Sequence, residues 1–183
     1  MLLFELCQCT LWEKLCEEPR RPPREARQCA SAVGAALAHL HRCHTIHTDV
    51  KPDNIFYSAA GTVKLGDLGG CVHATPNGRR QQEPNAIGTP FYQAPEIQRG
   101  ELYSFNVDCW SLGVVLLEMT TGIPAGDLWD IETVEAVDLD AAVSSAIGAF
   151  GLAAVKGFFS PNHGSKNKYC HVGFSVFKRT PVK

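Results

Sequence analysis

Three polar residues with complementary chemistry stand close together in the stretch Ile46–Phe56, which reads IHTDVKPDNIF: Asp49, Lys51 and Asn54. A carboxylate can accept the proton of a hydroxyl, an ammonium can neutralise a phosphate, and a side-chain carbonyl can hold a magnesium ion. The set is therefore suited to phosphoryl transfer. Taken singly, each of these residues is more often a solvated surface group or a helix cap.

The elements that must position this stretch are predicted from apolar spacing. Residues 1–7 read as an apolar strand that runs into a linker, and residues 11–16 as one or two helical turns. From about 24 to 42, apolar side chains recur every three or four residues, which predicts an amphipathic helix ending just before the motif.

After the motif, runs at 55–57 and 62–65 predict a hairpin. Residues 67–96 are turn-rich and polar, as in a long functional loop. The run 107–121 is apolar nearly all round, which predicts a buried helix, and Gly122 and Pro124 would end it.

Composition limits the function classes. The chain has 183 residues, enough for one core, and a net charge of -2, so no global basic field points to a nucleic acid partner. Its eight cysteines include no C-x-x-C pair, which favours free thiols in a reducing compartment, the cytoplasm or nucleus. No secretory signal opens the chain.

Four motifs together resemble the eukaryotic protein kinases. The stretch around Asp49 is similar to their catalytic loop, H-x-D-x-K-x-x-N. The other three, in matching order, are KLGDLG at Lys64–Gly69, GTPFYQAPE at Gly88–Glu96, and DCWSLG at Asp108–Gly113. The resemblance covers about residues 4–124 and is closest to the serine/threonine class.

The resemblance implies roles for individual residues. Asp49 would accept the proton of a substrate hydroxyl, Lys51 would stabilise the transferred phosphoryl group of ATP, and Thr89 would order the substrate side. Asn54 and Asp67 would hold Mg²⁺. Further implied roles are those of Glu5 and Cys7 in a hinge that meets adenine, of Leu68 packed beneath the site, and of Asp108 as an anchor of the catalytic loop. Gly69 would give the backbone freedom to turn, and His47 would be structural.

The chain also departs from the family pattern. It shows no glycine-rich loop, no V-A-I-K strand and no helix with the partner glutamate, so we expect weak ATP binding. Thr48 stands where the family carries the arginine of H-R-D, which meets a loop phosphate. Thr75 is the one hydroxyl residue between Asp67 and Gly88. Glu96 has no evident arginine partner, and burying it unpaired would cost roughly 3–5 kcal/mol.

The expected fold is mainly α with a small β-hairpin, a protein kinase-like C-lobe with the N-lobe largely absent. We divide it into an N-lobe and hinge remnant at 1–7, a partial C-lobe at 8–124, and a divergent tail at 125–183. The function implied is phosphoryl transfer from ATP to a Ser/Thr hydroxyl of a protein substrate. The alternative is an inactive fragment or pseudokinase that acts as a protein-binding module.

Two finer hypotheses remain open from the sequence. The motifs look like those of the Wee-type inhibitory kinases, with the kinases of translation initiation factor 2-alpha as the nearest rival. Residues 141–159 form a weak candidate membrane segment, but glycines, serines and Lys156 make insertion poor, so a membrane partner is not expected.

Overall fold

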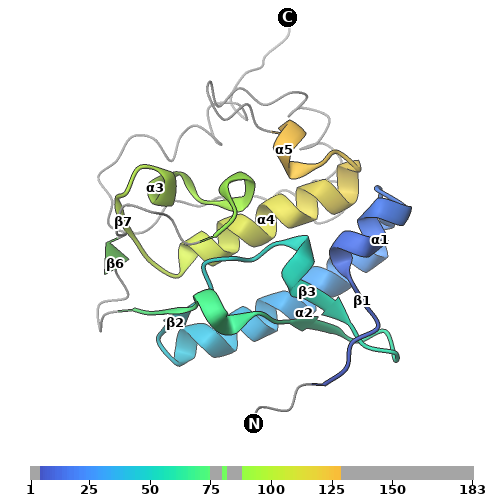
Figure 1. Cartoon of the computed structure of the whole chain (residues 1–183), viewed down its shortest axis with the longest axis horizontal. Coiled ribbons are helices and arrows are strands. Elements are labelled where there is room, and N and C mark those ends of the chain that lie inside the picture. The colour runs from blue at the N-terminus through green and yellow to red at the C-terminus, as the bar shows by residue number, and fades with distance from the viewer. Residues whose placement is uncertain (1–4, 75–79, 82–87, 129–183) are drawn as a thin grey trace, which may run out of the picture.

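The computed structural model describes residues 5–74, 80–81 and 88–128, coloured in Figure 1. Two long helices, α2 (Pro23–Arg42) and α4 (Asn106–Thr121), pack against each other, and a small three-stranded sheet lies against α2. The predictions for residues 1–4 and for the tail beyond Leu128, with its candidate membrane segment, lie outside this part of the chain. Among the described helices, none has the length and apolar character needed to cross a membrane.

Helix α2 forms where the apolar spacing predicted it, one residue earlier. Pro22 and Pro23 start it, because proline at the first helical position has no N–H to satisfy. Alanines fill much of its length, and one face is buried through Ala26, Cys29, Val33 and Leu37. This face packs on α4, so the helix that precedes the catalytic stretch is fixed by the core.

Helix α4 is the centre of the fold. It is buried on almost every side, as predicted, and its hydroxyls bond back to main-chain carbonyls, as Thr120 does to Leu116 at 2.8 Å. It ends at Gly122, whose φ of 76° is left-handed and whose N–H donates to Glu118 at 2.8 Å. The predicted helix and its stop are confirmed.

The amino-terminal elements differ from the expectation. Residues 5–7 are not in a strand; the first strand is β1 (Cys9–Thr10), which leads directly into α1 (Leu11–Glu17). Thr10 and Glu13 form a capping box there, with the Thr10 N–H donating to the Glu13 carboxylate at 2.7 Å. The helix is confirmed, whereas residues 1–4 of the predicted strand lie outside the described residues.

The predicted hairpin is confirmed as β3 (Ile55–Tyr57) and β4 (Val63–Leu65). The two strands are antiparallel with Ile55 opposite Leu65, and β1 pairs on the other side of β3. One step further along the ladder, the Gly66 N–H donates to the Asn54 carbonyl at 2.9 Å. The ladder therefore brings Asn54 and the residue after Gly66, Asp67, to the same end of the hairpin.

The segment predicted as a long loop carries short elements in its described parts. Two small antiparallel pairs tie it to the fold: β2 (Thr45–Ile46) with β5 (Val72–His73), and β6 (Arg80–Gln81) with β7 (Leu102–Tyr103). The remaining short elements are the 3₁₀ turns η1 (Pro52–Asn54), η2 (Leu68–Gly70) and η3 (Pro90–Tyr92), and the helices α3 (Pro95–Gln98) and α5 (Ala125–Leu128). Two-residue strands have no alternating pattern long enough to be seen in a sequence.

Two apolar clusters hold these elements together. The larger joins α1, α2, the hairpin and α4. The smaller gathers residues from β2, the region of α3, β7 and the first turn of α4: Ile46, Ala94, Ile97, Tyr103 and Val107. Trp110 of α4 packs against both clusters, so a single buried helix orients both sides of the site.

Candidate active site

The catalytic stretch is fixed to α4 by one buried carboxylate. Asp108 is fully buried, and its Oδ2 accepts from the His47 main-chain N–H at 2.9 Å while Oδ1 accepts from that of Thr48 at 2.8 Å. The His41 ring nitrogen Nε2 lies 2.7 Å from Oδ2. Asp108 therefore anchors this backbone, as the DCWSLG motif implied.

His47 is structural, as expected. It is fully buried, and its Nδ1 accepts from the Asp49 N–H at 3.3 Å, while Nε2 lies 3.0 Å from the Gly66 carbonyl. Since Nδ1 is an acceptor, Nε2 carries the proton and donates to that carbonyl. The ring thus joins the catalytic stretch to the end of the hairpin.

Asp49 stands at the centre of a dense polar group. Its Oδ1 accepts from the Thr89 hydroxyl at 3.0 Å, and its Oδ2 lies 3.0 Å from the Lys51 ammonium and 3.0 Å from the Asn54 amide. Lys51 also donates to the Thr89 hydroxyl at 2.8 Å. The structure therefore brings together the four residues assigned to the phosphoryl-transfer centre, although Thr89 comes 40 residues after Asp49 in the sequence.

The electrostatics keep Asp49 ionised. Partial burial acts to raise the pKa of this carboxyl, but the hydrogen bonds from Lys51, Thr89 and Asn54 outweigh it, so the pKa lies below its ordinary value. At neutral pH Asp49 is a carboxylate with donors at both oxygens. A group in that state can receive a hydroxyl's hydrogen bond and hold its proton.

The donor set for magnesium is small and consists of oxygen atoms. Both bonds from the Asn54 side chain use Nδ2, one to the Asp49 carbonyl at 2.8 Å and one to its carboxylate, which leaves Oδ1 for a ligand. Asp67 is exposed, and its Oδ1 accepts from the Gly69 N–H at 3.4 Å. No cluster of three His, Cys, Asp or Glu side chains suited to a metal occurs in the described ranges. A site with one carboxylate and one amide oxygen suits Mg²⁺, which keeps several waters and binds phosphate oxygens as well.

The turn that carries Asp67 differs in two respects from the expectation. Asp67 itself, and not Gly69, has the left-handed backbone, with φ 56°. Leu68 does not pack beneath the site, because its side chain is 56% exposed. The 3₁₀ turn η2 directs Leu68 outward, and no described residue covers it.

Glu5 and Cys7 lie apart from the four residues around Asp49. The Glu5 carboxylate is paired with Lys64 of β4 at 2.8 Å, and Cys7 is half-buried beside β1. They flank the hairpin that carries Asn54 and Asp67, on the side where Glu5 pairs with Lys64. Their role toward adenine stays a prediction.

Glu96, in the APE-like segment, is the second residue of α3 and is partly buried. Burial raises the pKa of its carboxyl, and the charge of Glu101 raises it further, while Arg99 acts in the opposite direction. No ion pair of Glu96 with a cation exists within the described residues. The expected lack of an arginine partner for Glu96 stays a prediction.

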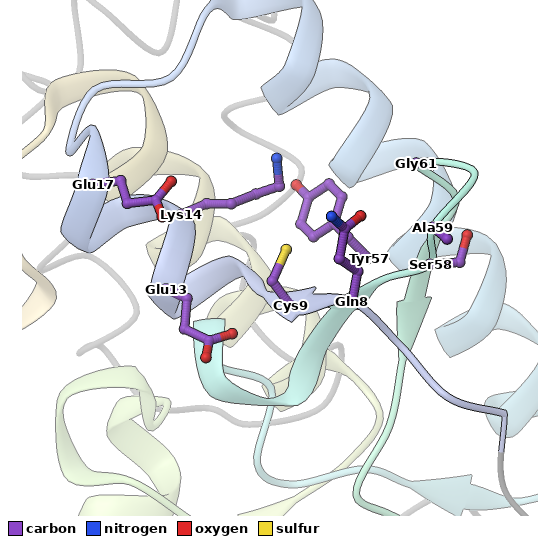
Figure 2. A pocket seen from close by; sticks show the side chains of 9 residues that line it. All are labelled: Gln8, Cys9, Glu13, Lys14, Glu17, Tyr57, Ser58, Ala59 and Gly61. Atoms are coloured by element: carbon purple, nitrogen blue, oxygen red, sulfur yellow. The ribbon is translucent and has the colours of Figure 1, made fainter.

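A hollow of about 370 Å³ lies between α1 and the turn of the β3–β4 hairpin, away from Asp49 (Figure 2). Lys14 and Tyr57 point toward each other in it, and the Lys14 ammonium sits 4.6 Å from the Tyr57 ring centre. The Tyr57 hydroxyl is the one buried side-chain polar atom in the described residues without a hydrogen bond. None of the predicted site residues lines this hollow.

Sequence reasoning missed two residues that shape the site. His41 reaches Asp108 across 67 positions, and only the fold brings the two together. Gly88 has φ 103°, and a Cβ there would meet the Thr48 carbonyl oxygen at 2.6 Å. The glycine before Thr89 was visible in the sequence, but its need for a left-handed backbone was not.

Comparison with known proteins agrees with this geometry. The family model described as "Protein kinase domain" matches residues 1–145. Serine/threonine-protein kinase pakC of Dictyostelium discoideum is 42% identical over 89 residues, which are 49% of this chain and 18% of the relative.

Two further relatives are similar to the same extent. Serine/threonine-protein kinase CLA4 of Candida albicans is 42% identical over 88 residues, 48% of this chain and 9% of the relative. Serine/threonine-protein kinase pak-1 of Caenorhabditis elegans is 43% identical over 89 residues, 49% of this chain and 15% of the relative. The chain thus spans less than a fifth of the length of these curated relatives. Since the family model matches well over half of the chain, the chain belongs to the protein kinase domain family.

Proposed function

We propose that this chain carries the phosphoryl-transfer centre of a serine/threonine-type protein kinase. The observation that carries the proposal is the arrangement at Asp49, whose two carboxylate oxygens receive Thr89 on one side and Lys51 and Asn54 on the other. The names of the relatives, serine/threonine-protein kinases, support the same hydroxyl class of substrate.

Each residue has a distinct task in this proposal. Asp49 accepts the proton of the protein hydroxyl while the hydroxyl oxygen bonds to the γ-phosphorus of ATP and the bond from that phosphorus to the departing ADP breaks. Lys51 places a positive charge beside the phosphoryl oxygens, where negative charge is spread in the transition state. Thr89 links Asp49 to Lys51 and sets the position at which the substrate hydroxyl can enter.

Asn54 and Asp67 would hold Mg²⁺, together with oxygens of ATP. When bound, the ion neutralises charge on the phosphates. The positions of these two residues at one end of the hairpin, and the open Oδ1 of Asn54, are consistent with that role. Glu5 and Cys7 would meet adenine in the finer form of the proposal.

The test is direct. The 183-residue chain is assayed for transfer of phosphate from radiolabelled MgATP to a library of Ser- and Thr-containing peptides. Asp49→Asn keeps the size of the side chain but removes the base, so it should lower any transfer by at least about a hundredfold. Glu17→Gln, an exposed carboxylate on α1, is the matched control. Equal transfer by the Asp49→Asn variant and the unaltered chain would contradict the assignment.

A second candidate is an inactive kinase-like module that binds other proteins. The exposed Leu68 favours it, because the apolar residue beside Asp67 has no cover in the described part of the chain. Calorimetric titration with MgATP separates the two: binding at submillimolar ATP favours the enzyme.

The narrower identity is a hypothesis on the motifs alone. The Wee-type and translation initiation factor 2-alpha kinase resemblances gain no support from the relatives described above, which have other names. Phosphorylation profiles on a peptide library would distinguish these groups by substrate. A cytoplasmic or nuclear location follows from the free thiols and is tested by imaging of the tagged chain.

A further inference from the structure

Thr48 has an unusual backbone for its residue type. Its φ is 70°, in the left-handed region that β-branched residues rarely occupy, and its side chain is only 4% exposed. Such a conformation persists only where surrounding contacts over-determine it, and it points to a role for the residue.

The contacts of Thr48 reach three different segments. Its main-chain N–H donates to Asp108 of α4 at 2.8 Å, and its hydroxyl donates to the Gly70 carbonyl at 3.0 Å. Its own carbonyl oxygen faces Gly88, where an added Cβ would lie 2.6 Å away. One residue therefore touches the anchoring helix, the turn that carries Asp67, and the segment that carries Thr89.

The side-chain bond closes a two-point clamp on the Asp67 turn. His47 donates to the Gly66 carbonyl at 3.0 Å on one side of Asp67, and Thr48 donates to the Gly70 carbonyl on the other. Between these points, Asp67 holds the Gly69 N–H and the Cys71 N–H bonds to Leu68 at 3.2 Å. The turn is otherwise exposed at Asp67, Leu68 and Gly69, so few other contacts restrain it.

We propose that Thr48 is a positioning residue, whose hydroxyl fixes the Asp67 turn on the catalytic stretch by an uncharged hydrogen bond. At this position the resembled kinases use an arginine that meets a phosphate. Here the bond is made between two uncharged groups of the chain itself, the Thr48 hydroxyl and the Gly70 carbonyl. The kinetic consequence rests on the proposed function, but the structural one does not.

The decisive measurement is hydrogen–deuterium exchange of the full 183-residue chain, read by NMR at the amides of Gly69 and Cys71. Thr48→Val removes the hydroxyl at nearly constant volume and should speed exchange at both amides by about five- to tenfold, the factor expected for one neutral hydrogen bond. Thr48→Ser keeps the hydroxyl and should retain protection. The amide of Gly66, bonded to Asn54 within the ladder, is the internal reference.

Two further variants complete the design. Thr48→Ala also lacks the hydroxyl but has no β-branch, so it fits the left-handed backbone better than valine and keeps the test open if Thr48→Val does not fold. Thr62→Val replaces an exposed threonine at the other end of the β3–β4 hairpin, away from the turn, and should leave Gly69 and Cys71 unchanged. Unaltered exchange at Gly69 and Cys71 in Thr48→Ala would overturn the proposal.

Activity gives an independent second reading. In the peptide phosphorylation assay, Thr48→Val should raise the half-saturating Mg²⁺ concentration about fivefold, and Thr48→Ser should restore it. If the unaltered chain transfers no phosphate while the exchange pattern is as expected, the proposed function fails and the clamp stands. If transfer is normal and the exchange pattern is not as expected, the clamp fails alone.

Discussion

Replacing Asp108 by asparagine tests how the site is anchored. The carboxylate accepts two donors at Oδ2, from His41 and the His47 N–H, and a third at Oδ1, from the Thr48 N–H. Asparagine has the same shape but one acceptor and one donor. If the asparagine oxygen takes the Oδ2 position, its amide N–H₂ must face the Thr48 N–H. In the opposite orientation, the N–H₂ faces both the His41 ring and the His47 N–H.

The expected loss follows from this count. A buried donor without a partner costs about 1–3 kcal/mol, and hydrogen bonds to a charged group contribute more than neutral ones. With at least one donor opposed and the remaining bonds weakened, Asp108→Asn should lower the free energy of unfolding by about 2–4 kcal/mol. Against a typical domain stability of about 5–15 kcal/mol, that is a large fraction, yet it leaves a folded population to measure.

The assay is urea unfolding followed by far-ultraviolet circular dichroism at constant pH. The midpoint should fall while the slope stays the same, since a changed slope would mean a changed surface of unfolding. Glu17→Gln, an exposed carboxylate, should change stability by less than about 0.5 kcal/mol. A loss below about 1 kcal/mol for Asp108→Asn would refute the view that three donors depend on this carboxylate.

Three other perturbations have definite expected outcomes. Hydrogen bonding lowers the pKa of Asp49 despite its burial, so its ionised form contributes stability above about pH 4 that is lost as the pH falls further. Asp49→Asn should therefore flatten the acidic part of the curve of unfolding free energy against pH. Burial raises the pKa of the Cys29 thiol to about 12, so iodoacetamide at pH 8 should label exposed Cys16 in the folded chain and spare Cys29, as read by mass spectrometry. Gly88→Ala should lower phosphoryl transfer at least about tenfold, because the alanine Cβ would meet the Thr48 carbonyl oxygen and the backbone φ is 103°. Normal transfer by this variant would show that the Thr89 segment adjusts freely.

The long, periodic parts of the fold were predictable from the sequence. The buried face of α2 and the all-round apolar character of α4 require many residues in a regular pattern, and both helices end within one residue of the expected positions. The hairpin was readable because two short apolar runs flank Gly61, which has φ 75°. These signals depend on local sequence, so no knowledge of tertiary contacts was needed.

The contacts that complete the site could not be read in this way. Two-residue strands such as β2 and β5 are fixed by partners 26 or more positions away in the chain, and the outward direction of Leu68 depends on which residues cover it. The His41–Asp108 contact and the Thr48–Gly70 bond likewise join positions 67 and 22 apart. A motif names the residue types at such a site, but only the packed fold determines their partners.

The contacts that position the site all start from α4. That helix is the most completely buried element, and Asp108, which with Glu118 is one of its two buried carboxylates, fixes the backbone of the catalytic stretch. Residues 47 and 48 then hold the turn around Asp67, and the Thr48 carbonyl sets the approach of Gly88 and so of Thr89. Asp49 follows these two residues directly and meets Thr89 within a hydrogen bond. Displacement of Asp108 should therefore disturb the metal-side turn and the substrate side together, whereas loss of the Thr48 hydroxyl should disturb the metal side alone.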